Sequence, residues 1–188
     1  MLNFAYGSNL LMERLQARVP QARFVTTGRL QGWRFAFNVR SQDGSAKANA
    51  LRSDQPGDLL SGVIYELDEA GKATLDRYED VGGAYRIEHA NALTEHGLME
   101  VYLYTGSETH YVEGLAPYDW YLGFILAGAM QHQLPEPFIT KLRSATAKND
   151  PDHARATENW KLIPPRPAIT AGPILARRPA QRFTHARV

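Results

Sequence analysis

The chain has 188 residues, enough for one domain with a real core, and its 44% hydrophobic and 22% charged residues are typical of a globular protein. The formal net charge of +1 gives no global argument for nucleic-acid or membrane partners, and the lack of cysteine excludes disulfides, thiolate metal sites and a cysteine nucleophile. No secretory signal and no apolar stretch of membrane-spanning length is visible. We therefore expect a cytoplasmic protein that binds neither nucleic acid nor membranes.

The first ten residues carry the most distinctive local pattern. Apolar residues alternate at first and then recur at helical spacing: Leu2, Phe4 and Tyr6, followed by Leu11, Leu15 and Val19. This pattern predicts a strand that runs into a helix through Gly7-Ser8-Asn9. Gly7 tolerates unusual backbone angles, and Ser8 or Asn9 can cap the helix. Such a junction directs free N–H groups at one point, which suits a carboxylate, a phosphate or an oxyanion. An ordinary strand-to-helix turn explains the same residues equally well.

The remainder of the chain predicts several short strands and three more helices. Strands are expected over residues 24–27, 33–37, 48–51, 61–67, 85–93 and 99–104. Asp68 is a suitable N-cap for a helix that Gly82-Gly83 would end. Two further helices are expected to open at Pro117 and Pro135. Strands at this spacing favour an antiparallel sheet or a small barrel over a βαβ array, so the predicted fold class is α+β.

We expect one domain over residues 1–163 and a Pro/Arg-rich extended tail over residues 164–188. The tail has five prolines and five arginines and contains no acidic residue. Its prolines oppose regular secondary structure, so we expect the tail to lie along the body of the protein, or along a second subunit of a homodimer. Phe183 is the only aromatic residue among these arginines, which makes the tail a weak candidate for a nucleic-acid contact.

Glu79 is the strongest candidate for a catalytic group. The motifs of nucleotide, zinc and serine-hydrolase chemistry are absent, and the six histidines lack ligand spacing, so we expect no metal and no other cofactor. Glu79 is expected at the C-terminal end of a helix, where the helix dipole disfavours its charge. Burial would add to this effect and suit Glu79 to act as a general base. The alternative is that Glu79 is one more surface acid within residues 76–80.

Two segments and their spacing resemble the γ-glutamylcyclotransferase family. They are FAYGSNLL over residues 4–11 and LDRYEDV over residues 75–81, the second followed by Tyr85. Shorter segments extend the resemblance over roughly residues 1–151: Gly28-Arg29-Leu30, Gly57-Asp58, residues 62–65, residues 117–121, Gly128-Ala129 and Leu134-Pro135. The last three are more similar to γ-glutamylcyclotransferase proper than to its shorter relatives. Asp80 departs from the pattern, because many relatives have glycine there.

The resemblance implies a small closed mixed or antiparallel β-barrel with flanking α-helices and a cavity at its mouth. Glu79 matches the family's catalytic carboxylate. The resemblance also implies two groups of substrate-binding residues. A loop that holds the γ-glutamyl group consists of Tyr6, Gly7, Ser8, Asn9 and Leu10, and the two pocket tyrosines are Tyr85 and Tyr121.

The implied reaction needs no protein nucleophile, because the α-amine of a γ-glutamyl amide can close a five-membered ring on the γ-carbonyl. Glu79 would take a proton from the α-ammonium and return it to the leaving amine, which releases 5-oxoproline. We expect a small γ-glutamyl-amino acid as substrate and poor activity on glutathione, because Trp33, Tyr85 and Tyr121 would form a bulky wall beyond the scissile amide. The alternatives are a γ-glutamylamine or a γ-glutamylated biosynthetic intermediate as substrate, and a non-catalytic module that binds anions or peptides.

Overall fold

The computed structural model describes residues 1–165. The tail predicted for residues 164–188 therefore lies outside the described residues, apart from its first two positions. Within the described part, no helix is long and apolar enough to cross a membrane.

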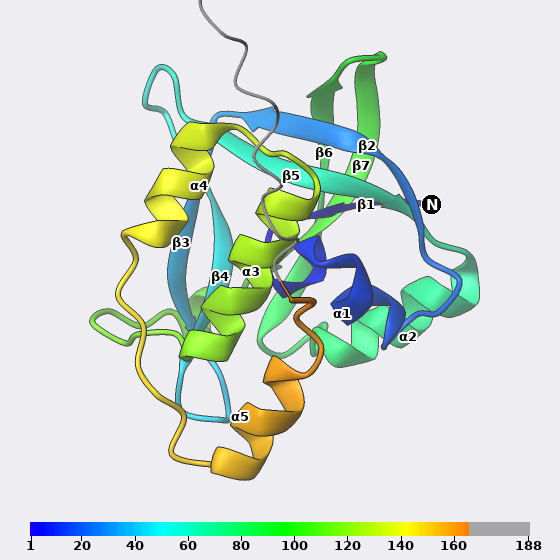
Figure 1. The fold of residues 1–188 in the computed structure, drawn as a ribbon. Coiled ribbons are helices and arrows are strands. Elements are labelled where there is room, and N and C mark those ends of the chain that lie inside the picture. Colours follow the sequence, from blue (N-terminus) through cyan, green and yellow to red (C-terminus); the bar gives the residue numbers. More distant parts are fainter. Residues whose placement is uncertain (166–188) are drawn as a thin grey trace, which may run out of the picture.

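Five strands form a closed barrel in the order β1-β5-β2-β6-β7 (Figure 1). Their bounds are Leu2–Ala5 for β1, Leu59–Glu66 for β5, Arg23–Gln31 for β2, Tyr85–Thr94 for β6 and Gly97–Gly106 for β7. All neighbours are antiparallel except β1 and β7, which pair in parallel through Asn3 and Tyr102. Residues 60–65 of β5 are all buried, as in a strand that is covered on both faces. The predicted closed mixed barrel and the α+β class are confirmed.

Two of the predicted strands lie outside the barrel. β3 (Trp33–Arg40) and β4 (Ala46–Arg52) pair with each other as a two-stranded ribbon, with an irregularity between Phe37 and Val39. Isolated ribbons of two strands are marginal on their own, so the ribbon depends on what packs against it. Figure 1 shows it beside helix α3, whose bounds are Asp119–Gln131.

The helices flank the barrel. They are a short 3-10 turn, η1 (Ser8–Leu10), followed by α1 (Met12–Gln16), α2 (Glu69–Tyr78), η2 (Glu108–His110), α3, α4 (Glu136–Arg143) and α5 (His153–Trp160). Asp68 caps α2 as predicted, because its carboxylate accepts the N–H of Gly71. Helix α5 was not expected from the sequence; it is a mostly polar helix without a buried residue, and its N-cap is Asp152.

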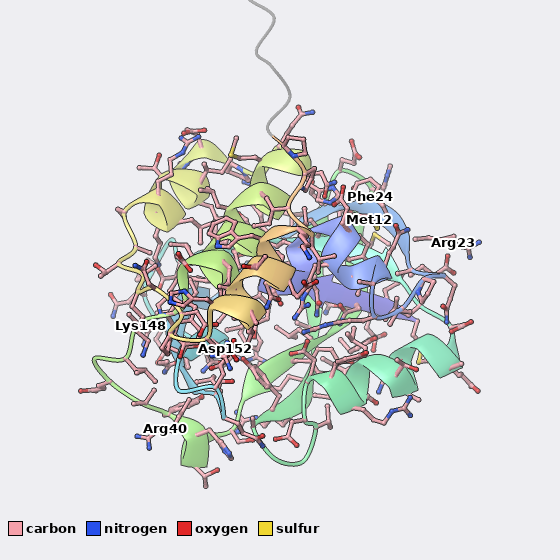
Figure 2. All side chains as sticks on the ribbon, turned by 60° about the horizontal axis from the view of Figure 1, so that its bottom comes forward. Met12, Arg23, Phe24, Arg40, Lys148 and Asp152 are labelled. Atoms are coloured by element: carbon pink, nitrogen blue, oxygen red, sulfur yellow. The ribbon has the colours of Figure 1, made fainter. Side chains whose placement is uncertain are left out.

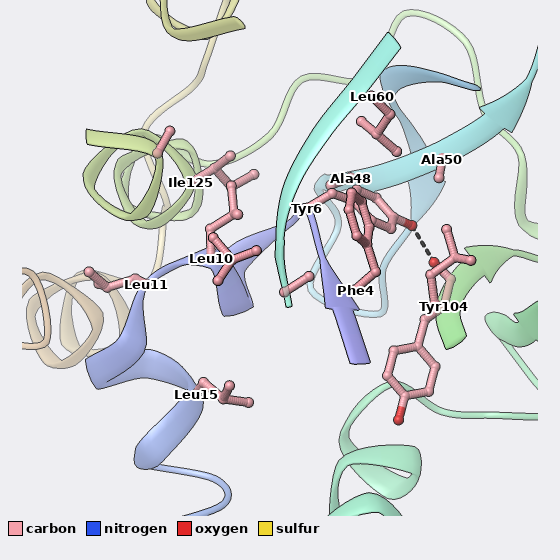
Figure 3. Packing of buried hydrophobic residues seen from close by; sticks show 14 of the residues in the cluster. Phe4, Tyr6, Leu10, Leu11, Leu15, Ala48, Ala50, Leu60, Tyr104 and Ile125 are labelled. Carbon is pink, nitrogen blue, oxygen red and sulfur yellow. Dashed lines mark hydrogen bonds between the residues drawn. The ribbon is translucent and has the colours of Figure 1, made fainter. Parts of the chain in front are cut away.

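Helix α3 presses directly on the η1 segment, and this contact fixes the loop after β1. A Cβ atom at Gly128 would lie 2.4 Å from both the carbonyl carbon of Leu10 and the nitrogen of Leu11. Only glycine allows helix and backbone to approach this closely. Leu10, Leu11 and Ile125 are fully buried at this contact, and Figure 3 shows Leu10 and Ile125 facing one another.

Candidate active site

The loop after β1 presents a row of unbonded backbone N–H groups. Leu10 N–H donates to the Gly7 carbonyl and Leu11 N–H to the Ser8 carbonyl, which closes the 3-10 turn. The N–H groups of Gly7, Ser8 and Asn9 find no acceptor within residues 1–165. These three N–H groups, called the N–H row below, are the donors that the sequence predicted at this junction.

One detail of the predicted junction is wrong. Neither Ser8 nor Asn9 caps a helix with its side chain, because η1 has no side-chain cap and the Asn9 side chain is engaged elsewhere. Gly7 has a φ of −102° and a ψ of −143°, which is neither helical nor left-handed. Space also favours glycine here, because a Cβ would lie 3.3 Å from the Ala48 Cβ and 3.5 Å from the Tyr121 hydroxyl oxygen.

Glu79 lies beside the N-terminal loop and is held in a three-residue network. Its Oε1 accepts one hydrogen bond from Asn9 Nδ2 and one from Arg18 Nη1, each 2.9 Å long. Arg18 Nη1 also donates to Asn9 Oδ1 at 3.1 Å, and its guanidinium lies 5.0 Å from the Tyr78 ring centroid. The side chains of Arg18 and Glu79 are 13% and 17% exposed, so Glu79 is not the surface acid of the alternative interpretation. The network fixes one carboxylate oxygen and leaves Oε2 without a partner among the described residues.

The turn that follows α2 positions the Glu79 side chain beside the N-terminal loop. The helix ends at Tyr78 with Glu79 as its C-cap, earlier than the predicted stop at Gly82-Gly83. Asp80 has a φ of 50°, in the left-handed region that glycine favours and that aspartate tolerates. Its carboxylate accepts the N–H of Ala84 at 3.0 Å, which stabilises the turn. This backbone conformation explains why glycine and aspartate are both compatible with this position.

Three tyrosines complete the site through hydrogen bonds to main-chain groups. Tyr85 donates its hydroxyl hydrogen to the Ala48 carbonyl at 2.8 Å, and Ala48 N–H donates to the Tyr121 hydroxyl oxygen at 3.1 Å. Tyr6 donates to the Tyr104 carbonyl, as Figure 3 shows. Burial raises the pKa of the Tyr6, Tyr85 and Tyr121 hydroxyls above the usual value, so all three remain neutral near pH 7.

A small cavity of about 30 Å³ lies between these groups and adjoins a cleft of about 460 Å³. Ser8, Glu79, Tyr85 and Tyr121 line both spaces. Asn9 and Tyr6 line the small cavity only. The smaller volume holds one or two water molecules, so a larger ligand must extend from the cavity into the cleft. Glu79 therefore stands at the junction, within reach of both.

Two residues of the sequence prediction are not part of this site. Leu10 is fully buried against α3, its N–H is bonded to Gly7, and it lines neither space. Trp33 lies in the ribbon with Arg52 stacked 4.0 Å from its ring centroid, and it lines neither space either. The proposed wall thus keeps Tyr85 and Tyr121 and loses Trp33.

The cleft contains charged residues that the sequence interpretation missed. Its cations are Arg14, Arg18, Arg40, Lys47 and Arg77, and its acids are Asp43, Glu79 and Asp80. Lys47 pairs with Asp43 at 2.6 Å and lies 4.6 Å from the Tyr121 ring centroid. Arg40 extends into solvent at the rim (Figure 2). Arg14 and Arg18 stand four residues apart, shortly after the loop that follows β1, and this helical spacing could have indicated them. Ala48 gave no sequence signal, because it acts through its backbone.

This arrangement can bind a zwitterion and move a proton. The N–H row can hold a carboxylate or a developing oxyanion, and Glu79 with the tyrosine oxygens can accept hydrogen bonds from an ammonium group. Residues 1–165 hold no cluster of three or more histidine, aspartate or glutamate side chains placed to bind a metal ion. The chemistry that these residues support is acid–base chemistry on a small polar ligand.

Known proteins with sequences and folds like this one agree with the geometry. A sequence model of the AIG2-like family matches residues 60–142. The γ-glutamylcyclotransferases of Bos taurus and Homo sapiens are 32% and 31% identical over 147 residues, which cover 76% of this chain and 77% of each relative. A solved structure of a γ-glutamyl cyclotransferase superposes with a TM-score of 0.75 at 28% identity, over 86% of this chain and 98% of that one. On the agreement of its sequence and its fold, this chain belongs to the γ-glutamylcyclotransferase family.

Proposed function

We propose that this protein is a γ-glutamylcyclotransferase that converts a small γ-glutamyl-amino acid into 5-oxoproline and a free amino acid. The observation that carries the proposal is the position of Glu79. Its carboxylate lies at the junction of the small cavity and the cleft, fixed by Asn9 and Arg18 and close to the N–H row. A module that only bound anions would gain nothing from a carboxylate at this point.

The reaction follows from these groups. Glu79 takes a proton from the substrate α-ammonium, and the freed amine attacks the γ-carbonyl carbon. The carbonyl oxygen becomes an oxyanion that neutral donors can stabilise without rearranging. The tetrahedral intermediate collapses as the amide C–N bond breaks and Glu79 returns its proton to the leaving nitrogen. The ring nitrogen then loses its second proton to Glu79, which passes it to the released amine, so the products are the neutral lactam of 5-oxoproline and an ammonium group. Holding the substrate in the ring-closing conformer adds several kcal/mol to the rate advantage.

The charge of the cleft favours an amino acid over a neutral amine as the leaving half. Arg14 lines the cleft and makes no hydrogen bond to any residue within 1–165, and its guanidinium lies 4.9 Å from the Phe124 ring centroid. Burial, with the nearby charge of Arg18, lowers the pKa of Arg14 to about 10. A desolvated cation without a partner is costly, and a carboxylate of the leaving half would offset that cost. A γ-glutamylamine offers no such group.

The site restricts the size of the leaving half less strictly than it restricts its charge. Tyr85 and Tyr121 form a wall where the cavity meets the cleft, which favours a short side chain over a cysteinyl-glycine. Exclusion by shape separates substrates by only a few kcal/mol, so residual activity on glutathione is compatible with the proposal.

The test is the release of 5-oxoproline by the full-length protein from γ-glutamyl-alanine, with wild type compared to Glu79→Gln. The amide keeps the shape of Glu79 but cannot take the ammonium proton, so the rate should fall by about 10²–10⁴-fold. Glu136→Gln is the matched control, because Glu136 lies in α4, lines neither space and has a side chain that is 68% exposed. A Glu79→Gln variant with more than about a tenth of the wild-type rate would exclude Glu79 as the base. Binding without turnover by the wild type would instead support the non-catalytic alternative.

Two further expectations belong to this proposal. A homodimer is the assembly that we expect if the tail packs on a second subunit, and light scattering of the full chain and of a chain that ends at Ile163 tests it. The cytoplasmic location also stays a prediction, which fractionation of the native source would check.

A further inference from the structure

The backbone of Ala48 gives two tyrosine hydroxyls opposite hydrogen-bonding directions. A backbone N–H can only donate and a backbone carbonyl can only accept. Tyr121 therefore receives a hydrogen at its oxygen, and Tyr85 gives its own hydrogen away. The chemistry of each backbone partner alone fixes the direction of the hydrogen bond.

The position of Ala48 explains why it offers both groups. Ala48 lies in β4, which among the described strands pairs only with β3. The other edge of β4 faces the small cavity, where a buried N–H and a buried carbonyl each need a partner. Tyr121 from α3 and Tyr85 from β6 supply them.

Each hydroxyl is left with a different unused capacity. Tyr85 has spent its hydrogen and can only accept a further hydrogen bond. Tyr6 is in the same state, because it donates to the Tyr104 carbonyl. Tyr121 keeps its hydrogen, for which residues 1–165 provide no acceptor.

The free hydrogen of Tyr121 lies next to the N–H row. The Tyr121 oxygen would be 3.5 Å from a Cβ at Gly7, so side-chain and backbone donors meet at one wall of the cavity. The acceptors are Glu79 and the oxygens of Tyr85 and Tyr6, which line the same cavity. Hydrogen-bond donors therefore line one side of the cavity, and hydrogen-bond acceptors line another part of it.

We propose that the Tyr121 hydroxyl donates a hydrogen bond to the scissile γ-carbonyl oxygen and to the oxyanion that forms from it, while the Tyr85 oxygen accepts a hydrogen bond from the substrate α-ammonium. This inference rests on the proposed function. No proton passes to or from Tyr121, since Glu79 takes the ammonium proton and returns it to the leaving nitrogen. The bond from Tyr121 strengthens as negative charge develops on the oxygen, whereas the bond to Tyr85 exists already in the ground state.

The two tyrosines provide matched variants, Tyr121→Phe and Tyr85→Phe. Each removes one hydroxyl of the cavity wall and one bond to Ala48, so a purely structural role would affect both variants alike. An oxyanion donor contributes about 10²–10³-fold to kcat, so kcat of Tyr121→Phe should fall by about that factor with little change in KM. Tyr85→Phe should instead raise KM, by about tenfold for one hydrogen bond to a charged group, and retain most of its kcat.

A third variant covers the case in which Tyr121→Phe is poorly folded. Replacing Tyr121 with 3-fluorotyrosine keeps the shape and the donor and makes the phenol more acidic, so kcat should stay the same or rise. Circular dichroism and melting of each variant accompany the kinetics. Equal losses of kcat in both phenylalanine variants, or a loss of kcat in the fluorotyrosine protein, would overturn the inference and leave the proposed function standing. A wild type that releases no 5-oxoproline would overturn both.

Discussion

Replacing Gly128 with alanine tests whether the contact of α3 with η1 holds the N–H row in place. The added Cβ would lie 2.4 Å from two backbone atoms of Leu10 and Leu11, whereas ordinary contact begins at 3.4 Å. The difference, 3.4 − 2.4, requires a shift of 1.0 Å between helix and loop. Overpacking of this kind costs about 1–3 kcal/mol, and the upper end applies here because backbone cannot rotate away. The higher helix propensity of alanine offsets about 1 kcal/mol of that cost.

We therefore expect Gly128→Ala to destabilise the fold by about 2 kcal/mol, which corresponds to a Tm lower by about 4–8 °C. The shifted loop should also lower kcat by about 10²-fold, because misplacement by about 1 Å has that effect on catalysis. Urea unfolding, thermal melting and the release of 5-oxoproline measure these effects.

Gly123→Ala is the control in the same helix. Its Cβ would lie 2.8 Å from Ile163 Cδ1 and 3.0 Å from the Trp160 ring, which are ends of side chains that can move. We expect its stability to stay within about 0.5 kcal/mol of wild type, because the propensity gain compensates for a small repacking. Equal stability of the two variants, or a wild-type kcat in Gly128→Ala, would refute the argument.

Three other predictions follow from charges and walls around the site. Arg14→Gln should lower kcat/KM for γ-glutamyl-alanine by about 10–100-fold and leave γ-glutamyl-ethylamide unaffected. Arg143→Gln in α4, an exposed arginine that lines neither space, serves as control, and equal losses with both substrates would contradict the role of Arg14. The ratio of kcat/KM for γ-glutamyl-alanine to that for glutathione should exceed one, and a ratio at or below one would move the protein to the glutathione-degrading group. The Arg155 guanidinium holds the pKa of Asp150 below its usual range. Its stabilisation is therefore present above about pH 4 and lost as the pH falls. Asp150→Asn should lower Tm at pH 6 and differ less from wild type at pH 2, and a constant difference would argue against this linkage.

The barrel could be predicted from sequence because its signals are local and repeated. Short apolar runs and the turn residues between them indicated the strands, and the family resemblance implied that the barrel is closed. The ribbon of β3 and β4 was assigned as strands but not separated from the barrel, because strand pairing depends on contacts between distant residues. Helix α5 was missed because it is short and mostly polar, and its apolar side consists of a few partly buried residues such as Ala156.

The site was predictable where chemistry shows in residue type. Glu79, Asn9 and the tyrosines could be named from motif and position, although the bond between Asn9 and Glu79 could not. Arg18 was missed because nothing local pairs it with a carboxylate 61 residues away. Ala48 could not be found at all, because any residue offers the same backbone groups. The structure does not place Leu10 in the site, because an apolar residue beside a binding loop is more often part of the core.

The pairing of β1 with β7 has a consequence for how the protein is made on the ribosome. Asn3 donates a hydrogen bond to the Tyr102 carbonyl, a partner 99 residues further along the chain. Until β7 has been synthesised the barrel cannot close, and until α3 follows, the loop after β1 lacks Gly128 and Tyr121. β1 can pair with β5 once residue 66 has been made, but its other edge stays open until β7 follows, and an open strand edge makes a nascent chain prone to aggregate. Synthesis arrested before residue 119 would yield a chain that has Glu79 and the whole loop after β1 but lacks the α3 wall of the candidate site.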